Sequence, residues 1–112
     1  MAKNPEHRDL FPGALEVMIL QSLRLRPMHG YALVKHIKQV SENLLQVEEG
    51  SLYPALQRLL LNGWVKAEWG VSESNRRARY YTLTAAGRKQ LTFEREQFSR
   101  MISAIHKVLE MA

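Results

Sequence analysis

Residues 64–83 read WVKAEWGVSESNRRARYYTL, and this stretch decides the fold class. Its two ends, 64–69 and 79–83, are short runs rich in aromatic and β-branched residues, which favour β-strands. The residues between these runs, 70–77, are polar and turn-forming. The pattern predicts a β-hairpin, and Asn75 suits its turn because asparagine tolerates the left-handed backbone conformation.

Upstream of the hairpin, apolar residues recur at helical spacing in three segments. The first helix is predicted over residues 14–25 and the second over 30–40. Pro27 ends the first helix, because the residue before a proline is pushed out of the α region.

The third helix is expected to begin near Ser51 and to stop at Asn62-Gly63, two residues that tolerate the left-handed C-terminal cap. A start near Ser51 places Pro54 in the first turn, where no backbone N–H is needed. Its apolar stripe consists of Leu52, Leu56, Leu59 and Leu60.

Downstream of the hairpin, Thr84 is a good N-cap for a last helix that runs toward Ala112. Apolar residues repeat along this helix at heptad spacing, which predicts a homodimer through it. The alternative is that the helix folds back on its own core as a fourth bundle helix. The predicted dimerisation residues are Leu91, Phe98, Met101, Ile102, Ile105, Val108 and Leu109.

The order of elements, three helices and then a two-stranded hairpin, is that of a winged helix-turn-helix. We therefore predict a mainly α fold with a small β-hairpin. Residues 1–11 form a flexible N-terminal arm, residues 12–84 the DNA-binding domain, and residues 85–112 the C-terminal dimerisation helix.

Composition excludes several other classes of protein. The chain has 112 residues, no cysteine and a net charge of +5, which together predict one domain without disulfides or thiolate metal sites and with a weak bias toward a polyanionic partner. The four histidines do not cluster, and no phosphate-binding glycine loop or Ser/His/Asp spacing is present, so we expect no enzyme, metal or cofactor. No apolar run is long enough to span a membrane and no signal peptide is visible, so we expect a cytoplasmic protein.

In a winged helix-turn-helix, the third helix is presented to the major groove of DNA and the hairpin tip contacts the flanking backbone or minor groove. Hydroxyl, amide and guanidinium groups are the donors and acceptors that such contacts need. A merely solvated hairpin tip is the alternative for the wing. The predicted DNA-binding residues are Lys35 and Lys38 of the second helix, Ser51, Tyr53, Gln57 and Arg58 of the third, and Arg76, Arg77 and Arg79 of the wing.

The remaining aromatic residues have a structural interpretation. Tyr31 is expected to pack the second helix, and Trp64, Trp69, Tyr80 and Tyr81 to pack the hairpin and the core.

Four motifs together resemble the PadR family of bacterial transcription regulators: MHGY at 28–31, EGSLYPAL at 49–56, NGW at 62–64 and RYYTLTAAG at 79–87. The single helix after the wing is similar to the smaller PadR subgroup. The resemblance implies a dimeric repressor of nearby promoters that is released by a small molecule or another signal.

By motif match, the resemblance implies that Tyr53 lies beside a phosphate and that Arg76 and Arg77 are the wing arginines. One departure is that Asn75-Arg76-Arg77 stands where the family often has glycine followed by Arg-Pro.

Two further functions compete with a DNA-binding regulator. One is a winged-helix module that binds another protein and no DNA, and the other is a small enzyme. For a regulator, Phe98, Met101 and Ile102 are candidates for a pocket between subunits that accepts a flat hydrophobic or aromatic effector. The alternative is that Phe98 simply fills the dimer core.

Overall fold

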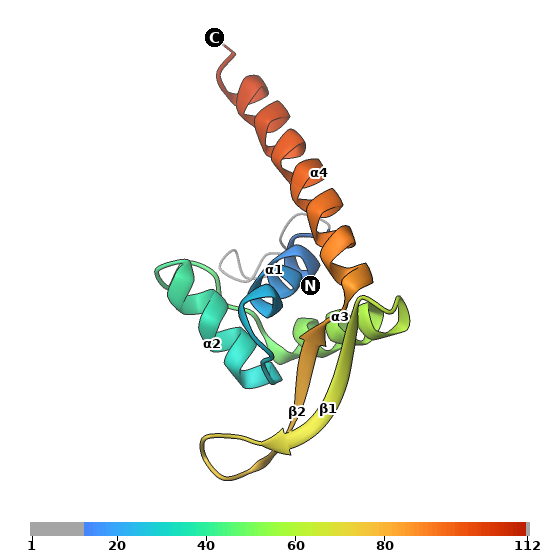
Figure 1. Ribbon diagram of the computed structural model, residues 1–112. Helices are drawn as coiled ribbons and strands as arrows, with labels where there is room; N and C mark the ends of the chain where they lie inside the picture. The colour runs from blue at the N-terminus through green and yellow to red at the C-terminus, as the bar shows by residue number, and fades with distance from the viewer. Residues whose placement is uncertain (1–12, 112) are drawn as a thin grey trace.

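The computed structural model describes residues 13–111, and the predicted arm over residues 1–11 lies outside that range. Three helices precede an antiparallel hairpin and a long last helix, so the predicted winged helix-turn-helix is confirmed (Figure 1). The elements are α1 (Ala14–Leu25), α2 (Gly30–Val40), α3 (Glu49–Leu61), β1 (Val65–Val71), β2 (Arg77–Leu83) and α4 (Ala85–Leu109).

The core lies where α1, α2 and α3 meet the base of the hairpin and the start of α4. Each helix contributes one apolar face at helical spacing, as the sequence predicts. Burial of these faces removes apolar surface from water, which is the main favourable term in folding. The largest fully buried side chains are Ile19, Leu20, Met28, Leu33, Leu52, Leu56 and Leu59.

Local signals set the ends of the first two helices. Arg26 is extended ahead of Pro27, and α1 ends at Leu25 as predicted. His29 caps α2, because its Nδ1 accepts a hydrogen bond of 3.1 Å from the backbone N–H of Ala32. An imidazole nitrogen here does what a hydroxyl or carboxylate oxygen does at most helix starts.

The third helix begins two residues earlier than predicted, at Glu49, and the expected place of Pro54 in its first turn is wrong. The N–H groups of Ser51 and Leu52 both donate to the carbonyl of Glu48, which winds the chain into a helix before Ser51. Pro54 therefore lies inside the helix and removes one intrahelical hydrogen bond. At the other end Gly63 has the expected positive φ, 74°.

The hairpin is longer than predicted, because the ladder of β1 and β2 continues to the pair Val71↔Arg77. Its turn has the predicted left-handed asparagine: Asn75 has φ 60° and donates its N–H to the carbonyl of Ser72. The base of the hairpin is joined to the start of α2, since Met28 and Tyr81 exchange backbone hydrogen bonds of 3.2 and 2.9 Å.

The last helix is fixed to the hairpin at its first turn. The Oγ1 of Thr84 accepts from the N–H of Gly87 at 3.0 Å, which confirms the predicted cap, and donates to the carbonyl of Gly63 at 2.7 Å. Gly87 packs directly on the carbonyl of Trp64, where a Cβ would collide with it. Glycine is therefore needed here for close approach. Helix propensity alone predicts only that Gly87 mildly destabilises the helix.

Beyond its first turns, α4 leaves the domain and points away from the hairpin tip (Figure 1). Leu91 is buried in the core of its own chain, so it does not belong to the exposed surface of α4, where a dimer contact was predicted. Within residues 13–111, no helix is both long enough and apolar enough to cross a membrane.

Candidate nucleic-acid interface

A groove of about 770 Å³ lies between the start of α2, the start of α3 and the outer half of the hairpin. The fold creates it because the hairpin extends past the core while its base stays joined to α2. Aromatic rings and guanidinium groups form much of its lining. The principal residues are Tyr31, Tyr53, Trp69, Arg76, Arg77 and Arg79.

Tyr53 lies in this groove and packs on the start of α2. Its hydroxyl occupies the space beside Gly30, where a Cβ would lie only 2.7 Å from the phenolic oxygen. The ring is about half exposed. Burial, and then the charges of Glu49 and Tyr81, raise the pKa of the Tyr53 hydroxyl above its usual value of 10.0. The group is therefore a neutral O–H donor at neutral pH, which suits an anionic oxygen.

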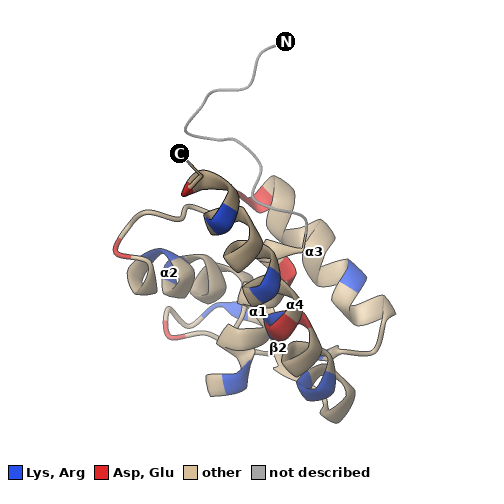
Figure 2. Cartoon of the chain, turned by 90° about the horizontal axis from the view of Figure 1, so that it is seen from above, with Lys and Arg blue, Asp and Glu red and all other residues tan. Residues whose placement is uncertain are grey.

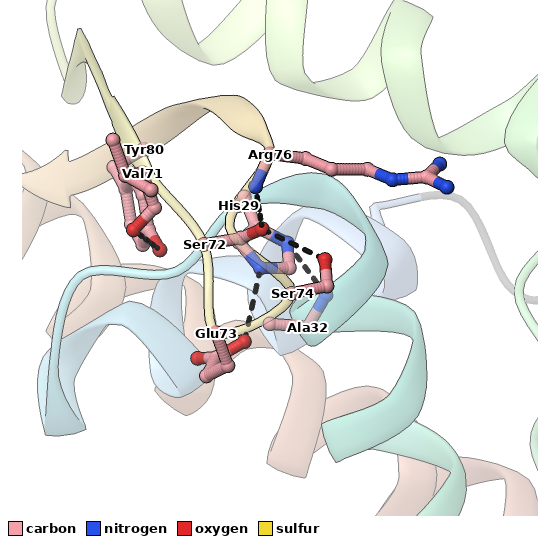
Figure 3. A network of polar contacts seen from close by, with 8 residues as sticks. All are labelled: His29, Ala32, Val71, Ser72, Glu73, Ser74, Arg76 and Tyr80. Carbon is pink, nitrogen blue, oxygen red and sulfur yellow. Dashed lines mark hydrogen bonds and ion pairs between the residues drawn. The ribbon is translucent and has the colours of Figure 1, made fainter.

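The wing turn is held by a small network of polar contacts (Figure 3). The Oγ of Ser72 contacts the hydroxyl of Ser74 at 3.0 Å and accepts the N–H of Arg76 at 3.3 Å. The carboxylate of Glu73 lies 3.7 Å from the Nε2 of His29, which brings the turn close to the cap of α2. The wing therefore curls toward α2 and closes one end of the groove.

Two of the wing arginines stack on aromatic rings. The guanidinium carbon of Arg77 lies 4.4 Å from the centroid of the Trp69 ring, and that of Arg79 lies 5.9 Å from the centroid of Tyr81. Both distances fall in the range of cation–π attraction. The Arg76 side chain instead extends away from the turn (Figure 3). The three arginines share one groove but differ in their immediate surroundings.

Two aromatic residues lie elsewhere than predicted. Tyr31 does not pack α2: it is 73% exposed, because the first turn of the helix turns it toward the groove. Trp69 is 62% exposed, because the hairpin has left the core at this point of β1. Tyr81, by contrast, is buried in the core as expected.

Four other predicted DNA-binding residues are exposed but do not line the groove. Ser51 and Gln57 lie on α3, and Lys35 and Lys38 lie on α2. A surface that included them would extend the groove along both helices.

Arg58 has a partner that the sequence pattern did not reveal. Its guanidinium donates to the carboxylate of Glu16 on α1, with nitrogen–oxygen distances of 3.2 and 3.4 Å. Figure 2 shows the acidic start and the single basic position of α3 as one red and one blue band. Contact between Arg58 and DNA stays a prediction, and it requires this ion pair to open.

The far half of α4 carries the remaining predicted residues. Met101, Val108 and Leu109 are exposed, while Phe98, Ile102 and Ile105 are half-buried. A shallow hollow along the helix includes Phe98 and Ile102 but not Met101. The structure therefore brings together two of the three residues proposed for an effector pocket.

Comparison with known proteins gives a family match. Residues 19–93 match the family model described as the transcriptional regulator PadR-like family. Among solved structures, the chain is similar to a transcriptional regulator from Clostridium thermocellum, with 30% identity, a TM-score of 0.80, and coverage of 89% of this chain and 97% of that one. It is also similar to a PadR family transcriptional regulator from Eggerthella lenta, with 31% identity, a TM-score of 0.73, and coverage of 89% and 85% of the two chains.

Proposed function

The chain belongs to the PadR-like family, a family of transcriptional regulators and not of enzymes, and we propose that it is a sequence-specific repressor that binds a palindromic operator as a homodimer. The observation that carries the proposal is the groove in which a neutral tyrosine hydroxyl and three wing arginines meet. Such donors suit the phosphate and base edges of duplex DNA.

In this proposal α3 enters the major groove, where Gln57 pairs with an adenine edge and Ser51 contacts a phosphate or base. Tyr53 donates its hydroxyl to a phosphate oxygen. Lys35 and Lys38 approach the backbone from α2. Arg76, Arg77 and Arg79 of the wing bind the flanking backbone or minor groove.

A second copy of the chain covers the exposed apolar stripe of α4 in the proposed repressor. Val108 and Leu109 are about 70% exposed in the single chain, at 66% and 73%. Removing such side chains from water favours association. Two reading helices related by a two-fold axis then bind half-sites about one helical turn, or 34 Å, apart.

Release from DNA is proposed to follow from a small hydrophobic or aromatic molecule bound at Phe98 and Ile102 on α4. A ligand there favours whichever dimer shape binds it better, and so changes the separation of the two reading helices. Since the partner is DNA, we place the protein in the cytoplasm.

A gel-shift and footprint on the DNA upstream of the protein's own gene, with random DNA of equal length as control, tests the proposal. We expect protection of two symmetric half-sites on one face of the duplex. Protection of a single asymmetric half-site by a monomer would contradict the dimer. Equal or absent binding to both DNAs would favour a protein-interaction module.

A further inference from the structure

The core-facing side of the hairpin continues beyond the core as a row of exposed residues. Alternate residues of a strand lie on one face, so Leu83, Tyr81, Arg79 and Arg77 form one row along β2. Leu83 and Tyr81 are buried, whereas both arginines are exposed. The same apolar face that anchors the wing thus becomes cationic where it leaves the domain and lines the groove.

Trp69 stands on the neighbouring strand within this face. It pairs with Arg79 in the strand register, and Arg77 lies diagonally across from it. The guanidinium of Arg77 lies over the Trp69 ring at 4.4 Å. A tryptophan that is 62% exposed contributes little to the core, so packing of the fold does not account for its position.

Arg76 provides the contrast. Its backbone N–H helps to hold the turn through Ser72, while its side chain extends away from the turn (Figure 3). Within residues 13–111 its guanidinium has no ion pair or ring contact. The guanidinium of Arg77 therefore has an aromatic neighbour that can fix its position, whereas that of Arg76 has none among the described residues.

We propose that Trp69 is a positioning residue that holds Arg77 for insertion into the minor groove beside each half-site, while Arg76 binds backbone phosphates without regard to sequence. The inference rests on the proposed DNA-binding function and adds a source of specificity to it. A narrow A·T-rich minor groove has an enhanced negative potential that attracts arginine. A guanidinium that is already held loses less conformational freedom on entering it.

The planar guanidinium is essential to this arrangement. Arginine stacks on an aromatic face, while lysine carries a compact ammonium on a flexible stem. Phenylalanine at residue 69 keeps an aromatic face for the guanidinium, and leucine keeps only apolar bulk. The chain therefore offers matched variants that separate stacking from charge and from size.

The experiment uses the full chain and duplexes that share one half-site, obtained by selection from a random library, and differ only in an A·T-rich or G·C-rich flank under the wing. Affinity is measured by fluorescence anisotropy across a salt series. We expect Trp69→Leu and Arg77→Lys each to reduce the A·T preference about two- to fivefold, the size of an exposed cation–π interaction. Trp69→Phe keeps most of the preference.

Arg76→Ala is the control, and we expect it to weaken binding to both flanks equally and to lower the salt slope by roughly one. Trp69→Leu combined with Arg77→Ala should be no worse than Arg77→Ala alone, because Trp69 acts through Arg77. Nuclear magnetic resonance provides a readout without DNA: ring-current shifts of the Arg77 side chain disappear in Trp69→Leu and persist in Trp69→Phe.

Two outcomes overturn the inference while the proposed function stands. One is an unchanged flank preference in Trp69→Leu and Arg77→Lys, and the other is full additivity of the Trp69 and Arg77 substitutions. If the unaltered protein binds no duplex above random background, the proposed function itself fails, and this inference falls with it. Since Arg77→Lys leaves Trp69 and the charge in place, it remains informative even where Trp69→Leu impairs folding.

Discussion

The guanidinium of Arg58 on α3 lies against the carboxylate of Glu16 on α1, with Nη2 3.2 Å from Oε1 and Nε 3.4 Å from Oε2. The pair joins the proposed reading helix to the helix that packs against α4. In the proposed complex with DNA, the Glu16 carboxylate would compete with phosphate for Arg58.

We therefore expect Glu16→Gln to strengthen DNA binding, because Arg58 is then free to contact a phosphate. The salt slope should steepen by roughly one unit for that added contact. Stability should change by no more than about 1 kcal/mol, since the Arg58 and Glu16 side chains are partly exposed. Anisotropy with Arg58→Ala as the partner variant checks this. If Arg58→Ala binds DNA as well as the unaltered protein, the pair only supports the fold.

Two glycines in helices should respond oppositely to alanine. Gly87→Ala places a Cβ against the carbonyl of Trp64 and 2.7 Å from Leu83, so we expect a loss of at least about 1–3 kcal/mol in the free energy of unfolding. Gly50 has nothing within 4 Å of its Cβ position, so Gly50→Ala should stabilise α3 by up to about 1 kcal/mol. Urea denaturation measures both, and equal effects would show that the Gly87 contact relaxes easily.

The proton of Tyr53 should make stability fall at alkaline pH. Its pKa is raised above 10.0 in the folded state, first by burial and then by Glu49 and Tyr81, so the folded chain holds the proton more tightly than the unfolded chain. The contribution is fully present below pH 10 and is lost as the pH rises through the folded value.

Ultraviolet titration of tyrosinate, as the difference between the unaltered protein and Tyr53→Phe, should give a midpoint above 10.0. Glu49→Gln should lower that midpoint, because one of the charges that raise it is removed. Glu96→Gln removes the same charge from an exposed position on α4 and should leave it unchanged. A midpoint at or below the usual tyrosine value would contradict the environment described for Tyr53.

The α4 stripe should control dimerisation without controlling the fold. Replacing both Val108 and Leu109 with Asp should raise the dimer dissociation constant by at least about tenfold, since each buried apolar side chain contributes roughly 1.5–3 kcal/mol. Both residues are exposed in the single chain, so thermal unfolding of the domain should change little. Sedimentation measures the dimer, with Phe93→Asp as an exposed control off the stripe. Dimers that survive the double variant would place the interface elsewhere.

Much of the fold could be predicted because its signals are local. Thr84, Asn75 and Pro27 act on the backbone within a few residues of themselves, and each has the predicted effect. The start of the third helix is less accessible to sequence analysis. Pro54 favours a start near Ser51, and the actual N-cap, Glu48, makes no side-chain cap hydrogen bond that would mark the earlier start.

Features of the site that join distant segments could not be predicted. Arg58 and Glu16 are 42 residues apart, and the contact between Gly87 and Trp64 depends on how α4 leaves the hairpin. Trp69 shares a face of the hairpin with buried residues, so the two-residue period of the strand alone predicts that Trp69 packs in the core. Trp69 is exposed only because the hairpin extends past the core. How far it extends depends on the packing of the whole domain and not on the local sequence.

The close packing of Gly87 on the carbonyl of Trp64 bears on how α4 and the hairpin move relative to each other. Because no side chain separates Gly87 from Trp64 and Thr84 is bonded to Gly63, the first turn of α4 packs directly on the backbone at the base of the hairpin. From this contact α4 extends about 37 Å, at the usual helical rise for its 25 residues. The hairpin of β1 and β2 extends from the same contact to the wing tip. In the proposed dimer, a change in the angle at which the two α4 helices cross would therefore rotate the hairpin of each subunit with its helix.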